Sequence, residues 1–284
     1  LTAPPVPKLP GVQNPIDAFI REKLAAKHLT PAPEADRARL LRRLSLDLTG
    51  LPPTPAETAA FLADSSPRAY EAQVERLLAS PRHGERMAVW WLDIARFSDT
   101  VGFHGDQNQR IFPYRDYVIG AFNTNKRFDQ FTIEQLAGDL LPDANDEQRL
   151  ATAFHRQTMT NTEGGTDDEE FRSAAVVDRV NTTMTVWMGA TVGCAQCHDH
   201  KYDPVSQREY FGLYAFFDQT EDTDRPDEAP LLRVPTKAQR ARLAELFGID
   251  ADRVNVKGKT GEKVDAIGRG EAMRATVVAL LGPA

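Results

Sequence analysis

The sequence predicts a mainly α-helical protein: an irregular multi-helix domain with long loops, followed by a short C-terminal β-turn-α segment. Apolar residues recur at three- and four-residue spacing along most of the chain, which is the period of an amphipathic helix. Few segments alternate with the two-residue period of a strand. The 284 residues include 41% hydrophobic and 26% charged residues, a composition that supports a folded core.

Successive helices are predicted from apolar spacing and from the residues that begin and end them. The first begins at Pro15, the second ends at Gly50, and Pro55 occupies the first turn of a third. Further helices are expected, in chain order, over 68–78, 85–94, 114–122, 131–140, 151–159, about 167–191, 237–247 and 271–281. Thr166 is the predicted N-cap of the long helix, because acidic residues at 167–170 suit its first turn.

Composition divides the chain into four regions. Residues 1–13 are rich in proline and resemble an interdomain linker, so we expect the chain to be a fragment of a longer protein. Residues 14–220 form the main helical domain. Residues 221–248 form a charged linker and helix, and residues 249–284 form the β-turn-α segment, which includes a strand-like stretch over 253–257.

Composition also argues against two classes of partner. The formal net charge is −7 and the isoelectric point about 5.5, whereas non-specific binding to nucleic acid needs a basic face. No apolar run reaches the roughly 18–20 residues that a membrane-spanning helix needs. We therefore expect no nucleic-acid partner and no membrane span.

The two cysteines of the chain lie in one C-x-x-C-H motif, formed by Cys194, Cys197 and His198. Two thiols at this spacing can each add to a vinyl group of haem, and the adjacent histidine then binds the iron. Three alternatives stay open at this point: a zinc site that includes His200, a redox dithiol, and a pair of buried inert thiols.

A second axial ligand to such an iron is not determined by the motif. His200 is too close in sequence to His198 to reach the opposite face of the same iron. His104 is the favoured candidate, because it lies in a polar, Gly-containing loop over 98–108 and functional residues concentrate on loops. An open position is an equal alternative, and the other candidate ligands are His155, Met159, Met184 and Met188.

Other polar residues are candidates for binding a cofactor or an ion. Arg115 is a candidate partner for a haem propionate, with an ordinary ion pair to Asp116 as the simpler alternative. Glu163, Asp167 and Asp168 are candidate Ca²⁺ ligands, although a favourable interaction with the helix dipole also explains their position.

Five blocks of sequence resemble the planctomycete-type cytochrome c proteins, specifically the uncharacterised domain that follows their N-terminal cytochrome c module. The resemblance covers about 14–233, and its blocks are 44–55, 112–119, 134–142, 162–165 and 193–204. It implies an exported, periplasmic or extracellular protein with haem c attached at Cys194, Cys197 and His198. It also implies a redox partner protein or an upstream cytochrome module. A weaker implication is redox chemistry on polysaccharides. No catalytic residue is implied, because the activity of the family is not established.

The C-terminal segment, about 250–282, resembles the C-terminal end of methylerythritol cyclodiphosphate synthase, an enzyme of isoprenoid biosynthesis. The resemblance implies a nucleotide diphosphate site at Lys257, Thr260 and Glu262, and a trimer core shaped by Arg269 and Glu271. The Asp-x-His and further His that bind the metal of this enzyme have no counterpart here. We therefore do not expect the segment alone to catalyse the cyclisation.

The leading hypothesis is an extracytoplasmic c-type haem protein that acts in electron transfer or haem-based redox chemistry, with residues 14–220 as the haem-c-type domain. One alternative is a fragment of the cyclodiphosphate synthase fused to this domain. Another is a carbohydrate-binding or hydrolytic domain that is stabilised by Zn²⁺ or Ca²⁺ and carries no haem.

Overall fold

A computed structural model describes residues 4–100, 102, 107–161, 163–222, 230–232, 237–248 and 250. These residues form helices and loops, and their one β-type pairing is the isolated bridge between Thr100 and Asn108. The mainly α prediction is therefore confirmed. The strand-like stretch and the last predicted helix lie outside the described residues.

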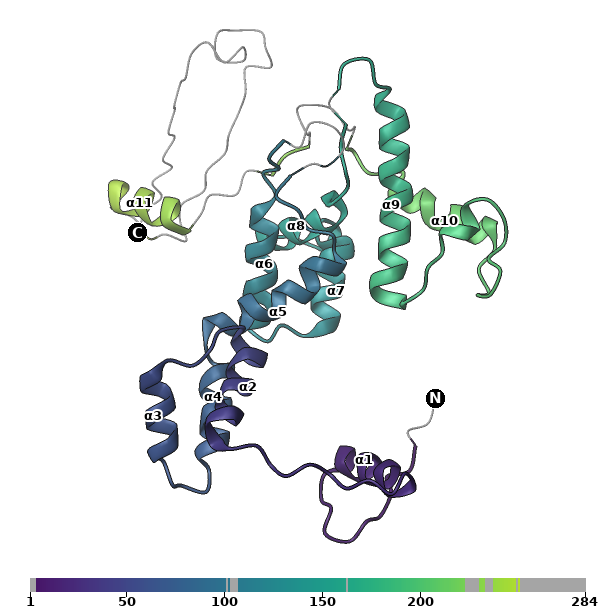
Figure 1. Cartoon of the computed structure of the whole chain (residues 1–284). Coiled ribbons are helices and arrows are strands. Elements are labelled where there is room, and N and C mark those ends of the chain that lie inside the picture. The colour runs from purple at the N-terminus through teal and green to yellow at the C-terminus, as the bar shows by residue number, and fades with distance from the viewer. Residues whose placement is uncertain are drawn as a thin grey trace. The chain divides into compact units, whose positions relative to one another are not determined.

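The α-helices follow one another in the order shown in Figure 1. They are α1 (Pro15–Ala26), α2 (Arg37–Thr49), α3 (Pro55–Ala63), α4 (Ala69–Leu78), α5 (Pro81–Ile94), α6 (Phe112–Asn123), α7 (Phe128–Ala137), α8 (Asp146–Ala151), α9 (Asp168–Met188), α10 (Gln207–Phe217) and α11 (Lys237–Phe247). Three short 3₁₀ turns join them, namely η1 (Gly138–Leu140), η2 (Thr152–Arg156) and η3 (Gly193–Gln196).

Local side-chain and backbone chemistry sets most of the helix boundaries. The C-cap of α2 is Gly50, whose φ of 71° lies in the left-handed region that glycine adopts without strain. Three described helices, α3, α8 and α10, begin with a capping box, in which the side chains of the N-cap and N3 residues each accept the other's backbone N–H. Their N-cap residues are Thr54, Asn145 and Ser206.

Several predicted boundaries differ from those in the structure. The N-cap of α9 is Asp167, whose carboxylate accepts the Glu169 and Glu170 backbone N–H groups, while the Thr166 hydroxyl donates to the Glu163 carbonyl at 2.9 Å. The helix predicted over 151–159 is instead the end of α8 followed by η2. Helix α5 begins at Pro81, four residues before the predicted start, because proline suits a first helical turn.

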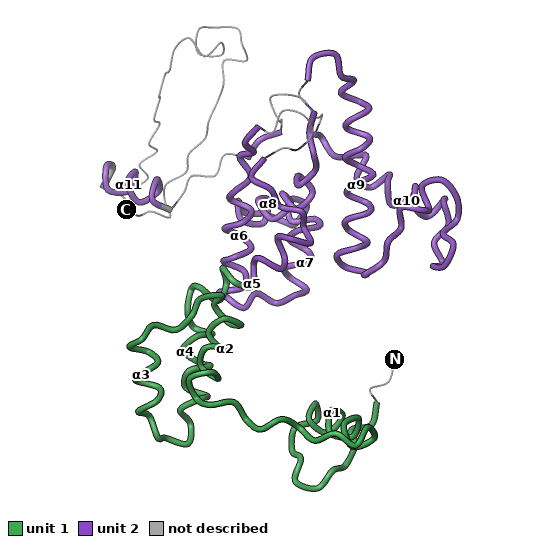
Figure 2. Tube along the Cα trace, in the orientation of Figure 1, with its two compact units in different colours: residues 1–86 green, residues 87–284 purple. Residues whose placement is uncertain are grey.

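The chain divides into two compact units, residues 1–86 and 87–284, and the division falls within α5 (Figure 2). Unit 1 has a small core of Leu41, Phe61 and Ala69. Arg37 of α2 stabilises this core. Its guanidinium lies 4.2 Å from the centroid of the Phe61 ring, and its Nη2 donates to the Phe61 and Asp64 carbonyls at 2.6 and 2.7 Å. The boundary predicted near residue 221 adjoins residues outside the described part and stays a prediction.

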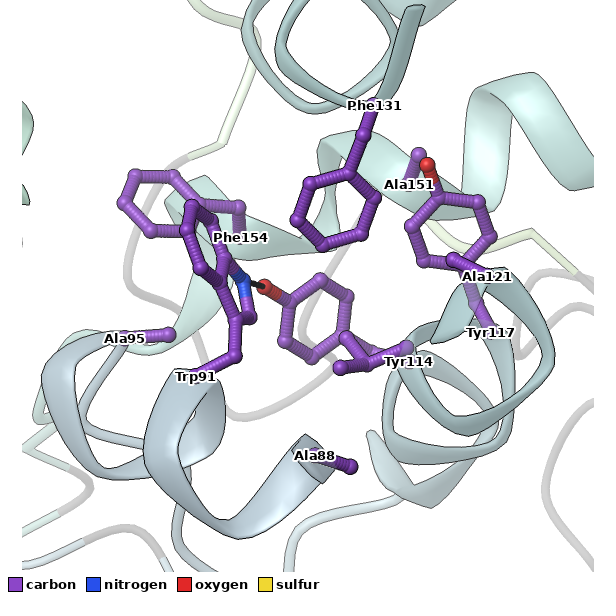
Figure 3. Packing of buried hydrophobic residues seen from close by; sticks show 10 residues of the cluster. Ala88, Trp91, Ala95, Tyr114, Tyr117, Ala121, Phe131, Ala151 and Phe154 are labelled. Atoms are coloured by element: carbon purple, nitrogen blue, oxygen red, sulfur yellow. Dashed lines mark hydrogen bonds between the residues drawn. The ribbon is translucent and has the colours of Figure 1, made fainter. Parts of the chain in front are cut away.

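The main core of unit 2 is aromatic and is shared by α5, α6, α7 and η2 (Figure 3). Trp91 packs edge-on against Phe131, with their ring centroids 4.7 Å apart. The Trp91 indole N–H donates to the Tyr114 hydroxyl at 3.0 Å and to Gln135 Oε1 at 2.9 Å, and the Tyr114 hydroxyl donates to the same Oε1 at 2.6 Å. Each buried donor therefore has an acceptor, so the polar groups do not weaken the core.

A second core in unit 2 lies between α9 and α10 and supports η3. Its buried residues are Val180, Val192, Ala195 and Tyr210. Helices α9 and α10 lie side by side (Figure 1). Because Val180 lies in this core and Trp187 packs against the aromatic core, α9 connects the two. No helix within the described ranges is long and apolar enough to cross a bilayer.

Candidate functional site

The C-x-x-C-H motif occupies η3 and the two residues after it. Ala195, between the cysteines, is fully buried in the core of α9 and α10, whereas Cys194 and Cys197 are exposed free thiols. The small apolar side chain thus anchors the turn while both sulfur atoms face solvent. The alternative of buried inert thiols is therefore wrong.

The imidazole of His198 has one nitrogen engaged by the backbone. Its Nδ1 lies 2.7 Å from the carbonyl oxygen of Asp199. A carbonyl can only accept a hydrogen bond, so Nδ1 carries the proton and the lone pair of the neutral ring lies on Nε2. Metal-binding histidines commonly have this arrangement, in which a second group holds the other ring N–H.

His200 organises the turn that follows the motif. Its side chain is 5% exposed, and its Nδ1 accepts the backbone N–H groups of Asp203 at 2.9 Å and Tyr202 at 3.3 Å. The backbone N–H of His200 donates to the Val205 carbonyl at 2.8 Å. The Nδ1 atom of His200 is thus committed to the backbone of its own turn.

Asp199 and Gln207 fasten the same turn to the start of α10. Asp199 Oδ1 accepts the Gln207 backbone N–H at 2.8 Å, and the Gln207 side-chain amide donates to the Gln196 carbonyl at 3.1 Å. The motif is therefore tied to α10 on both sides of His198. These bonds hold the imidazole in place through its neighbours along the chain.

This donor set fits covalent haem attachment. Two exposed thiols can form thioether bonds, and one adjacent imidazole presents an Nε2 lone pair to an iron. Within the described ranges, no three His, Cys, Asp or Glu side chains come together as ligands for a metal ion.

The other predicted site residues have varied positions. His104 lies outside the described residues, as do Lys257, Thr260 and Glu262. Arg115 lies beside Asp116, with Nη1 and Oδ1 3.6 Å apart, which is the ion pair weighed as the alternative to a propionate contact. The propionate contact itself stays a prediction.

The candidate methionines and the candidate calcium ligands are distributed over several elements. Met159 and Met188 are exposed, whereas Met184 packs against the second core. Gly102, at φ 75°, lies so close to Met159 that a Cβ there would be 2.9 Å from Met159 Cγ. Asp167 is the N-cap of α9 and Asp168 lies in its first turn, where negative charge suits the helix dipole.

Sequence reasoning missed a buried polar cluster beside α9. Arg179, 1% exposed, donates from Nε to the His155 carbonyl at 2.8 Å and pairs with the carboxylate of Asp222. Burial alone would raise the pKa of Asp222, but the hydrogen bonds and charge of Arg179 hold that pKa at about 2. Asp178, the residue before Arg179 in α9, accepts a hydrogen bond from Arg96 Nη1.

His155 is buried against this cluster and is neutral at physiological pH. Its ring lies 4.9 Å from the Phe217 ring and 5.2 Å from that of Phe154, measured between centroids. Burial lowers the pKa of His155 to about 4, and the charge of Arg179 acts in the same direction. The sequence carried no signal for this environment, because its members are separated by tens of residues.

Comparison with known families assigns most of the chain. Residues 15–222 match the family model PSCyt2, described as a protein of unknown function (DUF1549). The match covers more than half of the chain, so the chain belongs to this family. Residues 227–282 match the YgbB family, which bears out the resemblance stated for the C-terminal segment.

Curated relatives share similarity with this chain over a short stretch. All those named here are 2-C-methyl-D-erythritol 2,4-cyclodiphosphate synthases. The protein of Desulfosudis oleivorans is 52% identical over 54 residues, which is 19% of this chain and 32% of the relative. That of Laribacter hongkongensis is 46% identical over 54 residues (19% and 33%), and that of Chromobacterium violaceum is 45% identical over 67 residues (24% and 40%). The chain thus spans between about a third and two fifths of the length of these relatives. No solved structure matches the chain.

Proposed function

We propose that the chain binds haem c covalently through Cys194 and Cys197, with His198 as the iron ligand, and acts in electron transfer or haem-based redox chemistry outside the cytoplasm. The observation that carries the proposal is the outward display of both thiols around the buried Ala195, beside an imidazole whose Nε2 is available. The PSCyt2 family membership supports it.

The residues around the motif have distinct tasks in this proposal. Haem, when bound, supplies one-electron chemistry at its iron. The Asp199 carbonyl keeps the His198 proton on Nδ1, which makes Nε2 a better ligand. The hydrogen bonds from Gln207 to Asp199 and Gln196 hold the turn that carries the motif against the start of α10. The exposed surface around the thiols is open to a redox partner protein or an upstream cytochrome module.

The test is expression of the full chain in bacteria that carry the cytochrome c maturation machinery. We expect an intact mass increased by one haem and a pyridine haemochrome spectrum of the c type. The double variant Cys194→Ser/Cys197→Ser should lose both signals. A purified protein with the bare polypeptide mass would overturn the proposal, and bound zinc or calcium in that protein would favour the metal-stabilised, haem-free alternative.

The role of His198 as an iron ligand is tested separately, by the absorption spectrum of the haem protein. His198→Ala should shift the Soret band and lower the yield of haem protein. His28→Asn is the matched control, because His28 is exposed, has a φ of 55° that asparagine tolerates, and lies outside the motif. An unchanged spectrum for His198→Ala would remove this histidine from the proposed site.

The C-terminal match supports a second function. We propose that Lys257, Thr260 and Glu262 contribute to a nucleotide diphosphate site, as the resemblance of the C-terminal segment implies, and the match of residues 227–282 to the YgbB family supports this. Calorimetric titration of the full chain with CDP should show binding that Lys257→Ala abolishes. No heat of binding for the unaltered chain would refute this second function and would leave the haem proposal untouched.

A further inference from the structure

Four oxidisable rings follow one another through the aromatic core of unit 2. The centroids of the Trp187 and Trp91 rings lie 5.6 Å apart. The Trp91 Nε1 atom lies 3.0 Å from the Tyr114 hydroxyl oxygen, and the Tyr114 ring is stacked on the Tyr117 ring with centroids 6.3 Å apart (Figure 3). Tryptophan and tyrosine lose one electron more readily than the other ring-bearing side chains, and rings this close together exchange electrons rapidly.

The two tyrosines of this series differ in the group that accepts their hydroxyl proton. The Tyr114 hydroxyl donates to the side-chain oxygen of Gln135 at 2.6 Å, and an amide is too weak a base to take the proton. The Tyr117 hydroxyl donates to Glu134 Oε2 at 2.8 Å. Burial acts to raise the pKa of Glu134, but its hydrogen bonds, with that from Lys126 first among them, lower the pKa below its ordinary value. Glu134 is therefore a buried carboxylate that can accept a proton.

Lys126 couples the loss of an electron from Tyr117 to the loss of a proton. The Lys126 ammonium nitrogen lies 4.7 Å from the centroid of the Tyr117 ring, so a positive charge on this ring is unfavourable. Oxidation of Tyr117 therefore favours the neutral radical, which forms when the hydroxyl proton leaves. Glu134 lies within hydrogen-bond reach to take that proton. Lys126 then keeps a second carboxylate partner, because its Nζ also lies 3.2 Å from Glu147 Oε1.

We propose that these four rings form an electron-transfer chain that ends at Tyr117, where oxidation is coupled to proton transfer to Glu134. The oxidant reacts at Trp187, which is half-buried, whereas each of the other three rings is at most 9% exposed. A strong one-electron oxidant, such as a radical derived from a peroxide, takes an electron from Trp187, and successive transfers move the electron deficit to Tyr117. One electron thus passes from Tyr117 to the oxidant, and one proton passes from its hydroxyl to Glu134 Oε2. The chain does not depend on the C-x-x-C-H motif or on haem.

The experiment is flash photolysis of the full chain with tris(bipyridine)ruthenium(II) and an electron-accepting quencher, which together generate a strong one-electron oxidant in solution. The parent variant carries Cys194→Ser, Cys197→Ser, Tyr70→Phe and Tyr202→Phe, which removes both thiols and two exposed tyrosines. Without the thiols no haem can be attached, so the result is independent of the haem proposal. We expect a tyrosyl radical by electron paramagnetic resonance and transient absorption, and Tyr117→Phe in the parent variant should abolish it.

Further variants test the proton acceptor and the path. Glu134→Gln keeps the size of the side chain and an acceptor oxygen but cannot take the proton, so the Tyr117 radical should form about a hundredfold more slowly or less. Trp91→Phe should also slow its formation, because it interrupts the series. Trp90→Phe is the matched control and should not slow it, since Trp90 is the neighbour of Trp91 in the sequence but is 62% exposed. Circular dichroism and melting temperatures show whether each variant is folded.

Three results would overturn the proposal. The first is the absence of a tyrosyl radical in the parent variant, or a radical that Tyr117→Phe leaves unchanged. The second is a Tyr117 radical that forms as fast in Glu134→Gln as in the parent variant, which would show that Glu134 does not accept the proton. The third is an equal effect of Trp91→Phe and Trp90→Phe, which would place the path of the electron elsewhere.

Discussion

The protonation of His155 should make unit 2 sensitive to mild acid. The ring is buried between Phe154 and Phe217, and its pKa is about 4 in the folded chain. Burial is the main cause, and the charges of Arg179 and Arg96 add to it, while Leu136 and Asp222 oppose the shift without reversing it. In the unfolded chain the same ring has its ordinary pKa of about 6.5.

The sign and size of the effect follow from these two values. Between pH 6.5 and pH 4 the unfolded chain binds a proton at His155 that the folded chain does not, so the free energy of unfolding falls as the pH falls through this window. With about 1.4 kcal/mol for each pKa unit, the full loss is about 3 kcal/mol, of which about 2 kcal/mol occurs between pH 7 and pH 5.

The assay is urea unfolding followed by tryptophan fluorescence at pH 7 and pH 5, in amine buffers free of phosphate and carboxylates. All three tryptophans, Trp90, Trp91 and Trp187, belong to unit 2, so the signal reports on this unit. His155→Phe should show a loss between the two pH values that is smaller by about 2 kcal/mol. An equal pH dependence in the wild type and the variant would refute the reasoning.

Three further predictions concern the stability of unit 2. Gln135→Leu should lower the free energy of unfolding by about 2–4 kcal/mol, because Trp91 and Tyr114 then lose a buried acceptor; a loss under about 1 kcal/mol in urea denaturation would contradict the network. Gly138→Ala should cost about 1–3 kcal/mol, since its Cβ would lie 2.1 Å from a backbone oxygen of α8. Gly212→Ala, whose Cβ meets no atom within 4 Å, should instead stabilise α10 by up to about 1 kcal/mol. Thermal denaturation ranks the two alanine variants, and the reverse order would show the glycine argument to be wrong.

Most helices were predictable because their signals are local. Apolar spacing marks the buried face, and residues such as Gly50 and Pro55 act on the backbone of their own turn. The error at Thr166 has the same origin. Both Thr166 and Asp167 are good N-cap residues, and the choice of Asp167 depends on the loop before it, where Thr166 bonds back to Glu163.

The candidate site was only partly predictable. The C-x-x-C-H spacing identified Cys194, Cys197 and His198, because two thiols and an imidazole at that spacing are rare by chance. The buried cluster left no such mark. Arg179 and Asp222 are 43 residues apart, and nothing in the sequence near Arg179 distinguishes a buried guanidinium from an exposed one. Long-range pairing of this kind emerges only when helices pack.

The reciprocal caps of α3, α8 and α10 have a consequence for how this family diversifies. Because four adjacent residues determine where each of these helices starts, a loop in front of them can gain or lose residues without shifting the helix along its own axis. Insertions and deletions among homologues should therefore gather immediately upstream of Thr54 and Asn145. The stretch before Ser206 should vary less in length, because hydrogen bonds of His200 and Gln207 hold the turn that carries the cysteines against α10.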